Sequence, residues 1–146
     1  MAFWIGIDPG ENTGIAVWDG TSMRFVEVST LPLWQAMDKV RRMRYACLMQ
    51  QVPLYVVFED ARKRTWFPTE RNNAEYRGRL MGAGAAKRDA RIWEEFLEGM
   101  HVTFEARKPQ AGLTKWSADY WSLVTGWKGR TSEHARDAAL LVFGRK

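Results

Sequence analysis

The stretch that decides the fold is Phe3-Trp4-Ile5-Gly6-Ile7-Asp8-Pro9-Gly10, at the start of the chain. Its apolar run stops at Asp-Pro-Gly, a pattern that predicts a buried strand entering a turn. A second apolar run at 14–18 is closed by Asp19-Gly20, a strong hairpin signal, and residues 23–28 provide a third strand. Three strands joined by tight turns predict an antiparallel meander.

The hydrophobic pattern becomes helical after residue 30. Apolar residues near helical spacing predict a helix here, and they are Leu33, Met37, Val40, Tyr45 and Leu48. Pro53 marks the break after this segment, and the β-branched and aromatic run 54–58 predicts a central strand. Strand, crossover helix and strand together predict a parallel pair with a right-handed connection.

The rest of the chain continues the alternation of helices and strands. We expect a loop of mixed charge from 61 to about 76, a long helix over 79–100 and a fifth strand over 101–105. Two helices separated by a glycine-containing loop are expected within 114–143. Because there is no repeat, low-complexity tract or long linker, we expect one domain over residues 1–146. The predicted fold is α/β, with a mixed sheet flanked by helices.

Composition narrows the class of protein. The chain has 46% apolar and 27% charged residues, the balance of an ordinary soluble globular protein. Its net charge of +5 and its 8 tryptophans favour a polyanionic partner, although a modest positive charge also serves solubility alone. The single cysteine, Cys47, excludes an intramolecular disulfide and a cysteine-cluster zinc site, and we interpret it as a packing residue.

The sequence also carries expectations about location. No apolar run approaches the roughly 20 residues of a membrane span, so no membrane partner is expected. The N-terminus lacks the features of a secretory signal, and one cysteine suits a reducing compartment. We therefore expect a cytoplasmic protein.

Two carboxylates directly follow predicted central strands, Asp8 after the first and Glu59 after the fourth. Parallel neighbouring strands lie about 4.8 Å apart and end at the same sheet edge, where open α/β sheets bind ligands. Oxygen ligands at such an edge suit magnesium. Taken singly, Asp8 could merely open a turn and Glu59 could be a solvated strand end. Asp60 competes with Glu59, and strand alternation leaves that choice open.

A third signal lies near the C-terminus, in Ser132-Glu133-His134-Ala135-Arg136-Asp137. Thr131 or Ser132 is a natural N-cap, and the residues that follow favour a helix. His134 and Asp137 are three residues apart and so share one helix face. Together they could bind a metal or move a proton. Alternatively, Asp137 only complements the positive end of the helix dipole.

Taken in order, these motifs resemble those of the RuvC family of Holliday-junction resolvases. The opening motif is Ile5-Gly6-Ile7-Asp8-Pro9-Gly10 with Thr13-Gly14-Ile15-Ala16, and the second is Val56-Val57-Phe58-Glu59. The small-residue stretch 82–86 and the closing His134-Ala135-Arg136-Asp137-Ala138-Ala139 complete a set that runs almost from end to end. The resemblance implies a ribonuclease-H-like fold with a mixed five-stranded sheet flanked by helices.

The resemblance also implies an activity. Asp8, Glu59, His134 and Asp137 would form a two-metal site for magnesium, with manganese as an alternative, where water attacks the scissile phosphate. Members act as homodimers that make paired symmetric nicks in four-way DNA, and no small-molecule substrate is expected. At position 134 many relatives carry Asp, so the role of His134, as metal ligand or proton carrier, stays open.

Basic and aromatic residues around the site predict a DNA surface. The cluster that follows Glu59 comprises Arg62, Lys63, Arg64, Trp66 and Phe67. The arginines would hold phosphates, while an aromatic residue either wedges beside bases at the branch point or packs on the core. Lys108 and Lys115 flank the turn after the fifth strand and are further candidates.

Three other functions are compatible with parts of this pattern. A nuclease of the same fold could act on RNA–DNA hybrids or flaps, and a catalytically silent relative could only bind branched DNA. The opening glycine turn also resembles that of actin-like phosphotransferases. With 146 residues, the chain has no room for the paired domains that enclose their nucleotide, so we set that reading aside.

Overall fold

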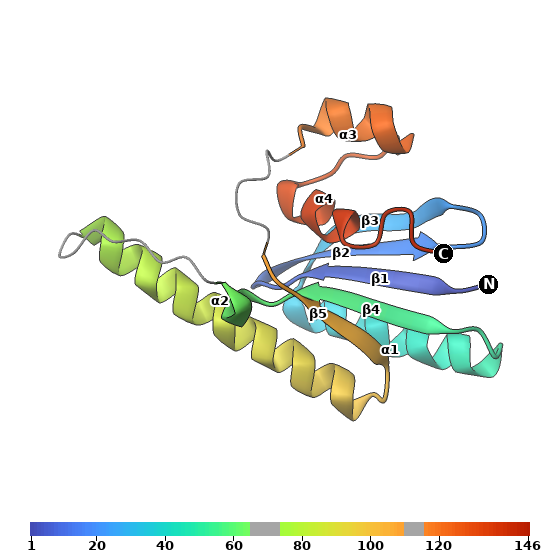
Figure 1. Ribbon diagram of the computed structural model, residues 1–146, viewed down its shortest axis with the longest axis horizontal. Coiled ribbons are helices and arrows are strands. Elements are labelled where there is room, and N and C mark those ends of the chain that lie inside the picture. The colour runs from blue at the N-terminus through green and yellow to red at the C-terminus, as the bar shows by residue number, and fades with distance from the viewer. Residues whose placement is uncertain (65–73, 110–115) are drawn as a thin grey trace.

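In the computed structural model, which describes residues 1–64, 74–109 and 116–146, five strands form one sheet in the order β3-β2-β1-β4-β5 (Figure 1). The strands are β1 (Phe3–Asp8), β2 (Asn12–Asp19), β3 (Arg24–Pro32), β4 (Leu54–Glu59) and β5 (Thr103–Arg107). The first three form the predicted antiparallel meander, whereas β1 pairs with β4 and β4 with β5 in parallel. The predicted mixed sheet is confirmed.

Helices cover both faces of this sheet. They are α1 (Leu33–Met49), the short 3-10 helix η1 (Ala61–Lys63), α2 (Ala74–Gly99), α3 (Ala118–Thr125) and α4 (Glu133–Leu140). α1 and α2 lie on one face and α4 on the other, while the N-terminal half of α2 projects past the sheet (Figure 1). No helix in the described ranges is long and apolar enough to cross a membrane.

Strand alternation divides the core into two layers. Odd-numbered residues of β1, such as Ile5 and Ile7, pack with Val40 of α1 and Trp93 of α2. On the opposite face Ala16 packs with the alanines of α4. This alternation decides which end-of-strand side chains point toward α4, because successive side chains of a strand face opposite ways.

The predicted first helix is present, but not all of its regularly spaced apolar residues face the core. Tyr45 and Leu48 are 63% and 52% exposed. Met43 and Cys47, one turn apart, pack on the core instead. Cys47 is buried and unpaired with another cysteine, as a packing residue should be, and burial raises the pKa of its thiol.

Candidate active site

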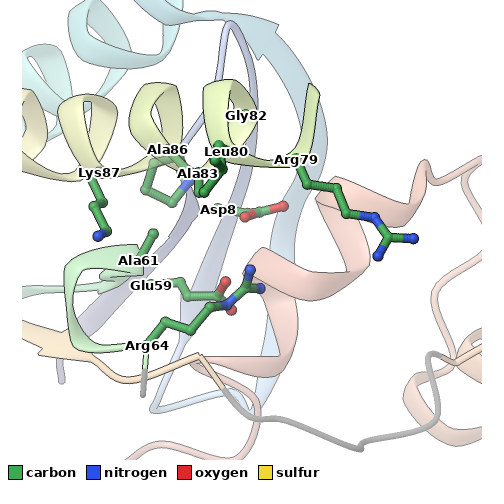
Figure 2. Close-up of a pocket in the computed structure, with 11 residues that line it drawn as sticks. Asp8, Glu59, Ala61, Arg64, Arg79, Leu80, Gly82, Ala83, Ala86 and Lys87 are labelled. Atoms are coloured by element: carbon green, nitrogen blue, oxygen red, sulfur yellow. The ribbon is translucent and has the colours of Figure 1, made fainter. Parts of the chain in front are cut away.

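The site forms where β1 and β4 end side by side. Their parallel register pairs Gly6 with Val57 and Ile7 with Phe58, so the next step along both strands brings Asp8 beside Glu59. Both carboxylates line one pocket at this edge (Figure 2). The convergence expected of two parallel strand ends is therefore present.

Of the two adjacent carboxylates Glu59 and Asp60, Glu59 lines this pocket. Asp60 is 2% exposed and does not line the pocket. Its carboxylate accepts hydrogen bonds from the backbone N–H and the guanidinium of Arg62, at 2.8–3.0 Å, and Arg62 also donates to Glu94 of α2 at 2.8 Å. The Arg62 guanidinium holds the pKa of Asp60 below its ordinary value. Asp60 thus fixes the turn after β4 and ties it to α2.

The last helix, α4, approaches the sheet closely because glycines lie beneath it. A Cβ added to Gly14 would overlap the backbone carbonyl of His134, and one added to Gly6 would overlap that of Ala138. Ser132 caps the helix by accepting a hydrogen bond from the backbone N–H of Ala135 at 3.0 Å. The two glycines of the opening motif therefore set the height at which His134 enters the site.

His134 is joined directly to the first carboxylate. Its Nδ1 lies 2.8 Å from Oδ2 of Asp8, and the two side chains are 59% and 16% exposed. A carboxylate can only accept, so Nδ1 carries the proton in this contact and Nε2 is the nitrogen left for other chemistry. Asp137 follows three residues later on α4, where it is half-buried.

Basic side chains line the pocket together with the two carboxylates. The pocket encloses about 560 Å³ between α2 and the sheet edge, and its charged lining residues are Asp8, Glu59, Arg64, Arg79 and Lys87 (Figure 2). Arg79 and Lys87 are not among the DNA-binding residues predicted from the sequence. The sequence does contain a signal for them. Arg79, Ala83 and Lys87 follow one another at intervals of four residues, so they share one face of α2.

The predicted DNA-binding residues are only partly placed. Arg64 is exposed and lines the pocket, and Lys108 is exposed just after β5. Lys63 is exposed and donates from Nζ to the backbone carbonyl of Ala106 at 2.7 Å, whereas Arg62 bridges Asp60 and Glu94. Trp66, Phe67 and Lys115 lie outside the described residues.

The donor set can be compared with the needs of magnesium, which binds through one or two carboxylates, substrate phosphates and several waters. Asp8 and Glu59 supply two carboxylates at one pocket, which fits that requirement. Within the described ranges, however, no three His, Cys, Asp or Glu side chains converge closely enough to hold a metal by themselves. Of the four residues predicted as ligands, Asp8 thus lies beside Glu59 and contacts His134, whereas Asp137 does not line the pocket.

Comparison with known proteins identifies the fold. No family model and no curated protein matches the sequence. Among solved structures, a Thermus thermophilus RuvC in complex with a Holliday junction substrate superimposes with a TM-score of 0.53 at 18% identity, covering 98% of this chain and 92% of that one. Another structure of Thermus thermophilus RuvC gives a TM-score of 0.47 at 17% identity, covering 97% and 92%. The chain therefore has the ribonuclease-H-like fold that its opening motifs predicted.

Proposed function

We propose that this protein is a magnesium-dependent endonuclease that cleaves four-way and related branched DNA. The observation that carries the proposal is that Asp8 and Glu59 end adjacent parallel strands and line one pocket together with basic side chains. Fold likeness to a RuvC bound to a Holliday junction supports the choice of substrate. The motif order along the chain supports the same choice.

In this proposal the chain's own groups hold and orient the reacting parts. Asp8 and Glu59 would bind magnesium, or manganese in its place, through carboxylate oxygens, with Asp137 as a further ligand. The metal, when bound, supplies Lewis-acid stabilisation of the phosphate and activates a water. His134 fixes the carboxylate of Asp8 through Nδ1, which leaves Nε2 able to exchange a proton with solvent or substrate.

The cations of the pocket would hold the phosphodiester next to the carboxylates. Arg64 extends from the turn after β4 and lies beside Glu59, while Arg79 and Lys87 lie at the two ends of the α2 side (Figure 2). The negatively charged DNA backbone would be repelled by the two carboxylates. Positive side chains beside them attract it. Lys63 and Lys108 at the same edge, with Trp66, Phe67 and Lys115, stay predicted DNA contacts.

A homodimer is part of the proposal. A four-way junction has approximate two-fold symmetry, so a dimer with two-fold symmetry would present one site to each of two strands of like polarity. Each protomer would then make one nick of a symmetric pair. Sedimentation of the protein with and without junction DNA tests this part separately.

The proposed activity is tested with a synthetic mobile four-way junction, a flap, a linear duplex and an RNA–DNA hybrid, each with magnesium and then manganese. We expect the wild type to cut the junction in preference to the duplex and Glu59→Gln to lose cleavage while retaining binding. Glu98→Gln, an exposed position at the far end of α2, is the matched control and should cut normally. Binding without cleavage in either metal would contradict the proposal in favour of a silent junction-binding protein. Preferred cleavage of the hybrid would contradict the choice of substrate.

A further inference from the structure

The pocket at the sheet edge is larger than a metal centre needs. It encloses about 560 Å³, whereas one water occupies about 30 Å³ in the liquid. A hydrated cation and one phosphate next to Asp8 and Glu59 fill only part of that space. The volume falls in the range of roughly 300–1,000 Å³ that takes organic ligands.

The α2 side of the pocket is apolar between its two charged ends. Leu80, Gly82, Ala83 and Ala86 form this wall, and Pro9 lines the pocket from the turn after β1. Leu80 is 44% exposed, so its side chain is available at the mouth. A phosphate gains nothing from aliphatic carbon, but the flat face of a nucleobase does, and enzymes commonly hold an unstacked base between apolar side chains.

The charges flank this apolar wall on two sides. Arg79 and Lys87 are eight residues apart on α2, about 12 Å along the helix axis, with Ala83 midway between them. Arg79 also pairs with Glu75 one turn away, but both side chains are more than half exposed, and such surface pairs exchange partners at little cost. A base with a phosphate on each side matches cations placed at both ends of an apolar surface.

We infer that this pocket takes one unstacked nucleotide of the strand to be cut. Its base lies on Leu80 and Ala83, and its flanking phosphates lie between the cations of the pocket and the carboxylates of Asp8 and Glu59. The inference rests on the proposed function, which it deepens by giving the site a nucleotide-binding subsite. It follows that the apolar wall of α2 positions the nucleotide next to which the strand is cut.

Two alanines of α2 provide a matched pair of variants. Ala83 is half-buried and lines the pocket, whereas Ala85 is exposed and does not line it. Ala83→Phe fills the pocket, and Ala85→Phe adds the same side chain to the same helix outside it. Because base stacking is worth about 1–3 kcal/mol per base, we expect Ala83→Phe to weaken junction binding by about tenfold or more. It should also move or remove the preferred cleavage positions, and Ala85→Phe should do neither.

A second measurement reports on the base itself and does not need a substitution in the apolar wall. In the Glu59→Gln protein, 2-aminopurine is placed at each position flanking the branch point, and its fluorescence is measured as protein is added. We expect a rise at one position next to the cleavage site, because this base fluoresces brightly once it leaves the stack for an aliphatic surface. The Ala83→Phe substitution in the same protein should abolish the rise.

The outcomes separate the two proposals. Normal junction cleavage by the wild type with no 2-aminopurine rise, or equal effects of Ala83→Phe and Ala85→Phe, would overturn the nucleotide pocket and leave the endonuclease intact. A wild type that neither binds nor cleaves branched DNA would overturn both.

Discussion

His134 Nδ1 lies 2.8 Å from Asp8 Oδ2 and thereby joins the first and last motifs of the sequence, 126 residues apart. Asp8 is 16% exposed and His134 is 59% exposed, so the imidazole is the more solvent-accessible partner of the pair. A hydrogen bond from Nδ1 fixes both the tautomer of the ring and the direction of the carboxylate. From this contact we propose that His134 positions Asp8, a role distinct from the two alternatives, metal ligand and proton carrier, that the sequence left open.

Two substitutions of His134 distinguish the positioning of Asp8 from other roles of the imidazole. Asparagine places an amide N–H close to where Nδ1 lies, so His134→Asn should keep the hydrogen bond to Asp8, whereas His134→Ala removes it. We expect His134→Ala to lower the single-turnover cleavage rate by about a hundredfold or more, and His134→Asn to recover about tenfold of that loss. Both proteins should unfold within about 0.5 kcal/mol of the wild type, because the side chain is largely exposed. Equal rates for the two variants would show that the Asp8 contact contributes nothing.

The Asp60–Arg62 pair predicts a stability effect that depends on pH. Asp60→Asn should lower the free energy of unfolding by about 1–3 kcal/mol at pH 7, because it weakens charge-assisted hydrogen bonds at a buried position. Arg62 lowers the pKa of Asp60 in the folded protein, so the carboxylate stabilises the fold above its unfolded pKa of about 3.9. That stabilisation is lost as the pH falls through the lower, folded pKa. Urea unfolding of both proteins between pH 7 and pH 3 should therefore show the difference shrinking only below about pH 4. A difference that already vanishes at pH 6 would contradict this account.

Arg62 and Arg64 should behave differently although they are two residues apart. Arg62 is held by Asp60 and Glu94, whereas Arg64 is exposed and lines the pocket. We expect Arg62→Gln to lower the free energy of unfolding by about 1–2 kcal/mol. Arg64→Gln should leave stability unchanged and lower the slope of log Kd against log salt for junction DNA by about 1. If Arg62→Gln alone changed the salt slope, the pair's roles would be reversed and Arg62 would be the DNA contact.

The strand ends of the site were predictable from sequence, because an apolar run stopped by a charged residue specifies a strand and its end. The choice of Glu59 over Asp60 was not, since it requires knowing that Val57 pairs with Gly6 and so shares the face of Asp8. The resemblance of the motifs made that choice, and the register gives its physical reason.

The positions of the helices were predictable from the sequence. Which residues of each helix face the core, the pocket or the solvent was less predictable. Tyr45 and Leu48 fit the apolar spacing that predicts the helix and are nevertheless exposed, since single apolar residues on a surface are common. Arg79 and Lys87 were overlooked for the opposite reason, since charged helical residues usually face water. Only the pocket shows that α2 passes over the sheet edge.

Replacing a glycine by alanine should have opposite effects on stability in the sheet and in α2. A Cβ at Gly14 would overlap the carbonyl of His134, whereas one at Gly84 would have no neighbour within 4 Å in the part of the chain that the structure describes, its own helix backbone aside. Gly14→Ala must therefore push α4 away from β2, and we expect it to lower the free energy of unfolding by about 1–3 kcal/mol or more. Gly84→Ala should raise it by up to about 1 kcal/mol, because alanine favours the helix.

The two substitutions, Gly14→Ala and Gly84→Ala, should also differ in their effect on DNA cleavage. Moving α4 moves His134 away from Asp8, so Gly14→Ala should lose cleavage even at temperatures where it is fully folded by circular dichroism. Gly84→Ala should cut at the wild-type rate. If Gly84→Ala instead destabilised the protein or weakened its self-association, the small residues of α2 would be packing against a second copy of the chain, as the proposed homodimer allows. A folded Gly14→Ala protein with normal cleavage would mean that the close approach of α4 to the sheet has no part in placing His134.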